Sequence, residues 1–246
     1  MLFWVTALIV LFATPVRAVE CGNVTYKGQG YTVCEVDMAT EEVRLFLNDP
    51  ATGAPLGSFT NVDRQLAREG RHLVFAMNAG MYHQDRSPVG YFVEQGRELA
   101  PVISRDGPGN FGMLPNGIFC IGDGRADVYE TRTFLAAKPV CRFATQSGPM
   151  LVIDGALHPR FLPDSDSRYR RNGVGTSPDG RRAWFVISDA PVTFYEFGSF
   201  FRDALKLRQA LYFDGNISRL YAPALDRFDG GFPMGPMVGV LNPVIE

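Results

Sequence analysis

Two short apolar stretches, AWFVISD (residues 183–189) and ALYFDGNIS (residues 210–218), decide how the chain folds. Each starts with apolar, β-branched or aromatic residues typical of a buried strand, and each then reaches an aspartate, Asp189 or Asp214. Between them, residues from Phe197 to Leu207 place apolar side chains at helical spacing, which predicts an amphipathic helix. The order is therefore strand, helix, strand, with a carboxylate at the end of each strand.

More short strands are predicted on the N-terminal side of these stretches, separated by Gly, Pro, Asn and Asp. They are Gly30–Val36, Glu42–Leu47, Leu73–Ala76, Gly90–Glu94, Gly117–Ile121, Ala126–Tyr129 and Met150–Ile153. A second helix is predicted over Gly57–Arg71. The fold class is α+β: a single domain with a mixed, mostly antiparallel sheet core and few helices. The Gly- and Pro-rich tail, Phe228–Glu246, is predicted to lie as coil on the surface or over a site.

Residues 1–18 have the features of a signal peptide, with an apolar run from Leu2 to Ala13 and Val16 and Ala18 before the cleavage point. Cleavage before Val19 leaves residues 19–246 as one periplasmic or secreted domain. A membrane anchor is the alternative, but this run is shorter than the ~20 residues that cross a bilayer. We expect no stable membrane span after cleavage. A net charge of −2 and the lack of Lys/Arg runs argue against a nucleic-acid partner.

The four cysteines, Cys21, Cys34, Cys120 and Cys141, all lie in the exported part. Three connectivities are open, and local pairing as Cys21–Cys34 and Cys120–Cys141 is favoured because each pair flanks a short hairpin-like stretch. The alternative is a metal site or a thiol nucleophile. No Cys-x-x-Cys occurs and no His lies near a Cys in the sequence, so structural disulfides are expected.

Polar residues follow several predicted strands. Asn78 and Gly80 come directly after Leu73–Ala76, where they fit a tight turn, and His83 lies on the loop beyond. Ser147, next to Gln146, lacks the Gly-x-Ser-x-Gly context of a hydrolase nucleophile and has no evident His partner. A plain turn and a plain loop are the alternatives for these segments.

The segment from Ser167 to Gly175 places three arginines in four positions. If it enters a strand, Arg168 and Arg170 face one side and Arg171 the other. A guanidinium of this set can bind a phosphate or carboxylate in bidentate fashion, the alternative being a solvated basic edge. Asp189 and Asp214 can share a cleft if their strands are neighbours, and paired carboxylates suit glycoside hydrolysis or a divalent cation such as Ca²⁺. Asp-Gly is also a common turn.

The order of these motifs is informative. Asn-Ala-Gly-Met-Tyr, Pro-Val-Gly, Gln-Ser-Gly-Pro-Met-Leu-Val, Arg-Asn-Gly-Val-Gly, Val-Ile-Ser-Asp and Ala-Leu-Tyr-Phe-Asp-Gly follow one another between Leu73 and Tyr221. In this the chain resembles the phosphodiester glycosidase family, some of whose bacterial members are associated with exopolysaccharides. The chain departs from the family's Asp-Gly-Gly-x-Ser motif at Asn216, which replaces the second glycine, and we expect this side chain to narrow the pocket.

The resemblance implies a hydrolase that cleaves sugar phosphodiesters in envelope or extracellular glycans. Asp214 and Asp189 are then the candidates for base, nucleophile or charge stabiliser, and Arg171 the candidate for phosphate. The candidate substrate-binding residues are Asn78, Gly80, Tyr82, His83, Gln146, Ser147, Arg168, Asn172, Gly215, Asn216 and Ser218. No cofactor is required by this chemistry. A non-catalytic glycan-binding module and a Ca²⁺ site on the two aspartates are the alternatives.

Overall fold

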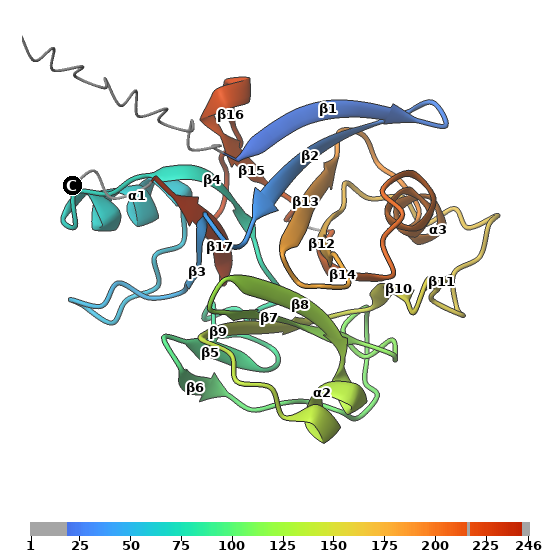
Figure 1. Ribbon diagram of the computed structural model, residues 1–246, viewed down its shortest axis with the longest axis horizontal. Coiled ribbons are helices and arrows are strands. Elements are labelled where there is room, and N and C mark those ends of the chain that lie inside the picture. Colours follow the sequence, from blue (N-terminus) through green and yellow to red (C-terminus); the bar gives the residue numbers. More distant parts are fainter. Residues whose placement is uncertain (1–18, 216, 243–246) are drawn as a thin grey trace, which may run out of the picture.

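The computed structural model describes residues 19–215 and 217–242. The predicted signal peptide and Asn216 lie outside the described residues, so both expectations about them stay predictions. Within the described part, three antiparallel sheets surround one interior, and Figure 1 shows the helices α1, α2 and α3 on the outside of this arrangement. The predicted α+β class with a mostly antiparallel core is confirmed.

The largest sheet has the order β1-β2-β13-β12-β14-β10-β11. Its strands are β1 (Glu20–Tyr26), β2 (Gln29–Asp37), β10 (Met150–Ile153), β11 (Ala156–Leu157), β12 (Asn172–Thr176), β13 (Arg182–Ser188) and β14 (Gln209–Asp214). The predicted strands at 183–187 and 210–213 are thus present, but β12 lies between them.

The other two sheets have five strands each. One has the order β16-β15-β4-β17-β3, with β3 (Glu42–Phe46), β4 (Leu73–Asn78), β15 (Leu220–Ala222), β16 (Arg227–Phe228) and β17 (Met237–Leu241). The other has the order β6-β5-β9-β7-β8, with β5 (Phe92–Glu94), β6 (Arg97–Ala100), β7 (Gly117–Gly122), β8 (Arg125–Glu130) and β9 (Phe143–Ser147).

The apolar runs of β13 and β14 are continuous because both faces of their sheet are covered. On β14, Leu211 and Phe213 point into the interior shared by the three sheets, where Phe213 meets Phe119 of β7. The alternate residues, Ala210 and Tyr212, point outward into a second apolar cluster. Because successive side chains of β14 point to opposite faces of the sheet, this one strand contributes to both apolar clusters.

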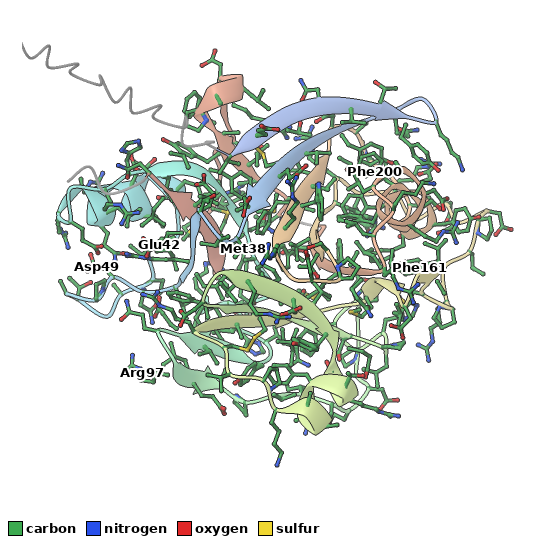
Figure 2. All side chains as sticks on the ribbon, in the orientation of Figure 1. Met38, Glu42, Asp49, Arg97, Phe161 and Phe200 are labelled. Atoms are coloured by element: carbon green, nitrogen blue, oxygen red, sulfur yellow. A yellow bond between two sulfur atoms is a disulfide. The ribbon has the colours of Figure 1, made fainter. Side chains whose placement is uncertain are left out.

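Each sheet carries a helix on its outer face. α3 (Phe194–Ser199) continues as the π-helical turn η1 (Phe200–Ala204). Together they pack on the largest sheet, in the region where Figure 2 labels Phe200 and Phe161. The single helix predicted over Phe197–Leu207 therefore starts earlier and changes winding. α1 (Phe59–Ala67) packs against β4 and β17, and α2 (Thr131–Ala137) against β7. A short 3₁₀ helix, η2 (Pro223–Leu225), links β15 to β16. None of the described helices is long and apolar enough to cross a membrane.

The prediction of a coil tail over Phe228–Glu246 was wrong for β17. This strand is fully buried and pairs with β4 on one side and with the edge strand β3 on the other. Its glycine, Gly239, packs so closely that a Cβ there would lie 2.6 Å from Leu73 Cδ2. Glycine in this strand therefore reflects close packing rather than a loop.

Both predicted disulfides are present, Cys21–Cys34 and Cys120–Cys141. The first joins directly opposite residues of β1 and β2, which secures an edge strand. The second ties β7 to the segment that follows α2, across a cluster that includes Phe134.

We expect replacement of Cys120 and Cys141 by alanine to lower the free energy of unfolding by about 2–4 kcal/mol, since the cross-link restricts the unfolded chain. Urea denaturation of the variant and of the oxidised wild type measures the difference. Wild type treated with reductant is the control and should shift in the same direction. Equal midpoints for all three samples would contradict the prediction.

Candidate active site

A cavity of about 690 Å³ opens beside the end of β14. Its lining comes from four chain segments: the loop after β4, the loop before β7, the segment that leads into β12, and the end of β14. The lining residues are Met81, Tyr82, Arg86, Val89, Pro108, Gly109, Asn110, Phe111, Ser167, Tyr169, Tyr212, Asp214, Gly215 and Ile217. Its mixed aromatic and polar walls are those of a small-molecule site.

Asp214 is the only carboxylate among the described residues that line this cavity. Its backbone N–H donates to Asn172 Oδ1 at 3.1 Å, and its Oδ1 accepts from the Gly215 N–H at 2.6 Å. Gly215 cannot be replaced without movement, because a Cβ there would lie 2.1 Å from the Tyr212 hydroxyl. The Asp-Gly pair thus turns the chain tightly against Tyr212 and presents the carboxylate to the cavity.

Three tyrosines stand around Asp214. Tyr82 is half-buried, Tyr169 is exposed and Tyr212 is fully buried. Burial raises the pKa of Tyr82, and the negative charge of Asp214 raises it further. Burial likewise raises the pKa of Tyr212 strongly, Asp214 adds to the increase, and the Arg171 guanidinium opposes it. Both phenols are therefore protonated at neutral pH and can donate hydrogen bonds to a ligand.

Arg86 is the one cationic side chain among the described lining residues, and the sequence reasoning missed it. It ends a turn in which its N–H donates to the His83 carbonyl at 2.9 Å, with a left-handed φ of 73°. Asp85 accepts from the N–H and hydroxyl of Ser87, which holds the loop in place. The guanidinium lies 5.4 Å from the Tyr82 ring centre. The predicted loop residue His83 is exposed and does not line the cavity.

Below the cavity, Asn78 and Asn172 form a buried pair that joins β4 to β12. Asn172 Nδ2 donates to the Asn78 carbonyl oxygen at 2.8 Å and to its Oδ1 at 3.1 Å, and Asn78 Nδ2 returns a bond to Asn172 Oδ1 at 3.3 Å. The Arg219 N–H donates to Asn78 Oδ1 at 2.9 Å. Ser218 Oγ lies 2.8 Å from the Asp214 carbonyl oxygen. This pair fixes both ends of the 214–219 loop.

Gln146, Ser147 and Gly80 are held by hydrogen bonds and close packing outside the cavity lining. Gln146 Oε1 accepts from the N–H groups of Tyr91 and Ile103, and Ser147 Oγ donates to the Phe213 carbonyl at 2.9 Å. Gly80 adopts a left-handed φ of 115° against Thr145. Asn78, Gln146, Ser147 and Asn172 are fully buried, so the structure places these predicted substrate-binding residues in the scaffold and not in the cavity lining.

Arg171, the predicted phosphate ligand, is 1% exposed. Its Nε donates to the Val192 carbonyl at 2.9 Å, its Nη2 to the Ser167 carbonyl at 3.0 Å and its Nη1 to the Tyr212 hydroxyl at 3.4 Å. The guanidinium lies 3.6 Å from the Phe194 ring centre. Burial lowers its pKa. With these contacts, Arg171 does not reach a ligand in the cavity.

Asp189 lies apart from the cavity, which corrects the expectation of a shared cleft. Its Oδ1 pairs with Arg227 Nη1 at 3.0 Å and accepts from Thr32 Oγ1 at 3.1 Å. The physical reason is topological: β12 separates β13 from β14, so the two aspartates end strands that are not neighbours. Arg168 is likewise exposed and pairs with Glu196 at 2.8 Å. Of the predicted residues that the structure describes, Asp214, Gly215 and Tyr82 line the cavity.

No three His, Cys, Asp or Glu side chains within residues 19–215 and 217–242 group closely enough to hold a metal ion. The alternative of a Ca²⁺ site on Asp189 and Asp214 stays a prediction, and elemental analysis of the purified protein tests it.

His158 is buried and stacks on Phe161 with ring centres 4.9 Å apart. Burial lowers the pKa of its imidazole, and the nearby Arg160 lowers it further. The unfolded chain then binds a proton that the folded chain does not, so stability is present above the ordinary His pKa and falls as the pH drops below it. We expect the unfolding free energy to decrease between pH 7.5 and 5 by up to about 1.4 kcal/mol per pH unit.

Urea titrations of wild type and His158→Gln across this range test the point. The variant should have the shallower dependence on pH. Parallel curves would assign the acid sensitivity to other groups.

A family model matches the part of the chain that contains this cavity. The family model for phosphodiester glycosidases matches residues 71–235, a span that includes Asp214, Arg86 and every other residue of the cavity lining. The chain belongs to the phosphodiester glycosidase family. The resemblance inferred from the motifs is thereby confirmed.

Three relatives illustrate the range of this phosphodiester glycosidase fold. The uncharacterised protein YigE of Escherichia coli (strain K12) is 31% identical over 220 residues, which cover 89% of this chain and 84% of YigE. The catalytic domain of zebrafish N-acetylglucosamine-1-phosphodiester alpha-N-acetylglucosaminidase, auto-inhibited by its pro-peptide, superposes with a TM-score of 0.61 at 12% identity, covering 92% of this chain and 84% of that one. A hypothetical protein from Synechocystis gives 0.60 at 12% identity, and the match covers 91% of this chain but 61% of the Synechocystis chain. The two solved structures share the fold with this glycosidase-family chain.

Proposed function

We propose that this chain is an exported hydrolase that cleaves the bond between a sugar and a phosphodiester in envelope or extracellular glycans. The observation that supports this most is Asp214, presented to a cavity whose walls hold Tyr82, Tyr169 and Arg86. A carboxylate, aromatic surfaces and a cation are what a sugar joined to a phosphate needs from its site.

In the proposed reaction, the bond between the anomeric carbon and the phosphate oxygen breaks, and the phosphate monoester leaves with the electron pair. Water adds to the anomeric carbon and releases a proton. Because phosphate is already a good leaving group, strong general-acid assistance is less necessary than for an ordinary glycoside. Asp214 stabilises the positive charge that develops on the sugar, either electrostatically, as nucleophile, or as base toward the water.

Arg86 is the residue we assign to the departing phosphate. A guanidinium forms charge-assisted bonds to phosphate oxygens, and Arg86 is the cation that the cavity presents to its contents. Tyr169, at 47% exposure, offers an open ring face to the sugar. The cation and the carboxylate thus serve opposite ends of the scissile bond.

The zebrafish relative's name specifies an N-acetylglucosamine phosphodiester, which makes that sugar the first to try. Mature protein is incubated with UDP-linked and p-nitrophenyl α-N-acetylglucosamine phosphodiesters, and free sugar is measured. Release of the reducing sugar is expected. Folded protein that releases no sugar from these compounds, or from a panel with other sugars, would reject the hydrolase as proposed.

A non-catalytic glycan-binding module in exopolysaccharide synthesis or export is the second candidate. One observation favours it: glycosidases usually employ two carboxylates, whereas Asp214 alone lines the cavity among the described residues. Such a module would bind a glycan without turnover, and Asp214→Asn would leave its affinity unchanged.

We place the chain in the periplasm or outside the cell. The two disulfides support this, since such bonds persist in oxidising compartments. Fractionation of cells that express the full chain, followed by detection in each fraction, tests it. Recovery of the protein in the cytoplasm alone would contradict it.

A further inference from the structure

The most unusual charge in this molecule is the guanidinium of Arg171. None of the ion pairs within residues 19–215 and 217–242 includes it; its hydrogen bonds go to two backbone carbonyls and one phenol. A cation taken out of water without a counter-ion is costly for the fold. Besides these bonds, the guanidinium packs on the Phe194 ring 3.6 Å away, which offsets part of that cost.

Arg171 lies directly behind the cavity wall. Of the groups it contacts, Ser167, Tyr169 and Tyr212 all line the cavity. Its charge is therefore separated from the cavity by a single layer of residues in a poorly solvated environment, where electrostatic interactions are stronger than in water.

The Tyr212 hydroxyl connects the two sides of that wall. Its oxygen accepts a hydrogen bond from Arg171 Nη1, and Asn110, another lining residue, also interacts favourably with the phenol oxygen. Its oxygen is engaged by these donors, and burial raises its pKa, so the hydroxyl keeps its proton. The Tyr212 side chain is fully buried, but unlike Asn78 and Asn172 it forms part of the cavity wall, so only a ligand seated directly against that wall can accept the proton. A donor that is itself polarised by a cation suits an anionic acceptor.

We propose that Arg171 and Tyr212 form an anion-binding pair, in which the Tyr212 hydroxyl donates to a phosphate oxygen and Arg171 supplies positive potential from behind. This rests on the proposed function, because it assigns the phosphate end of the substrate within the same cavity. The phosphate is held on the side of Tyr212 and Arg86, and the sugar carbon is turned toward Asp214. Arg171 is a positioning residue, since it acts through Tyr212 without touching the ligand.

The experiment measures binding of inorganic phosphate by calorimetry at fixed ionic strength, with no turnover involved. We expect Arg171→Met and Tyr212→Phe each to weaken phosphate binding by about tenfold or more, the range for a charge-assisted hydrogen bond. Because the two side chains act as one unit, the double variant should lose little beyond either single variant. Arg125→Met is the matched control, as it removes an exposed arginine on the β7–β8 hairpin that pairs with Asp127.

Thermal unfolding of each variant checks the fold, and if Arg171→Met does not fold, Tyr212→Phe alone carries the test. Wild type that binds no millimolar phosphate, or Tyr212→Phe that matches Arg125→Met, would overturn the inference. Phosphate binding that depends on Tyr212 in a protein that hydrolyses no sugar phosphodiester would support the anion-binding pair and reject the proposed hydrolase. The two failures are therefore distinguishable.

Discussion

Replacement of Asp214 by asparagine is expected to lower kcat for a sugar phosphodiester by about 10²–10⁴-fold, the range for loss of a positioned catalytic group. The side chain keeps its size and its Oδ1 can still accept from the Gly215 N–H, so the loop geometry should persist. What is lost is the negative charge beside the developing positive charge on the sugar. KM should change far less than kcat. Steady-state rates of sugar release, with the same substrates at saturation, measure the effect.

Two further variants make the result specific. Asp226→Asn changes an exposed carboxylate in a left-handed position that asparagine tolerates, and it should leave kcat unchanged. Asp189→Asn breaks the pair with Arg227 and should cost stability with little loss of kcat. If Asp189→Asn were as damaging to kcat as Asp214→Asn, the assignment of the catalytic carboxylate to Asp214 and not to Asp189 would be wrong.

Asn172→Ala is expected to lower the free energy of unfolding by about 2–4 kcal/mol and to reduce turnover as well. The substitution removes Asn172 Oδ1, which accepts from the buried Asn78 side-chain amide and from the Asp214 N–H, and it removes the two bonds that Asn172 Nδ2 donates to Asn78. An unsatisfied buried polar group costs about 1–3 kcal/mol, and several hydrogen bonds are lost together here. Turnover falls because the loop that presents Asp214 loses its anchor to β12. Urea denaturation and kcat on one preparation give both quantities.

Asn23→Ala provides the matched control, since Asn23 is exposed on the edge strand β1 and accepts one bond from Thr32. Its cost should stay within about 1 kcal/mol. Asn78→Ala combined with Asn172→Ala should cost less than the two single effects added together, because the side chains bond each other. Strict additivity would show that the two asparagines act independently.

The fold was predictable where strands bury apolar residues on both faces. β13 and β14 are obvious in the sequence for that reason. β12 was not recognised as a central strand because it reads Asn-Gly-Val-Gly-Thr, and glycine has low strand propensity. The structure requires these glycines: a Cβ on Gly173 would lie 2.5 Å from the Leu211 carbonyl, and one on Gly175 would lie 2.7 Å from Leu207 Cδ1.

That omission explains the error about the site. Without β12 between them, β13 and β14 read as neighbours, and Asp189 and Asp214 as a pair. The alternation around Arg171 was sound, since Arg168 and Arg170 are exposed and Arg171 is buried. The alternation pattern could not reveal that Tyr212 lies over Arg171 and keeps its guanidinium out of the cavity. Arg86 was missed because a lone arginine in a turn has no periodicity, although Asp-Arg-Ser-Pro is itself a turn signal.

The position of β17 has a consequence for biogenesis. Residues 237–241 are the last strand of the described chain to be synthesised, yet they join β3 to the rest of the sheet by pairing with both β3 and β4. Until they arrive, β3 has no strand partner in its sheet, β4 has one unpaired edge, and the interior that all three sheets share lacks Val238 and Val240. Such long-range pairing forms slowly, and until it forms, the unpaired strand edges are exposed and prone to aggregation. We therefore expect the nascent chain to depend on protection from aggregation until its C-terminal end is released.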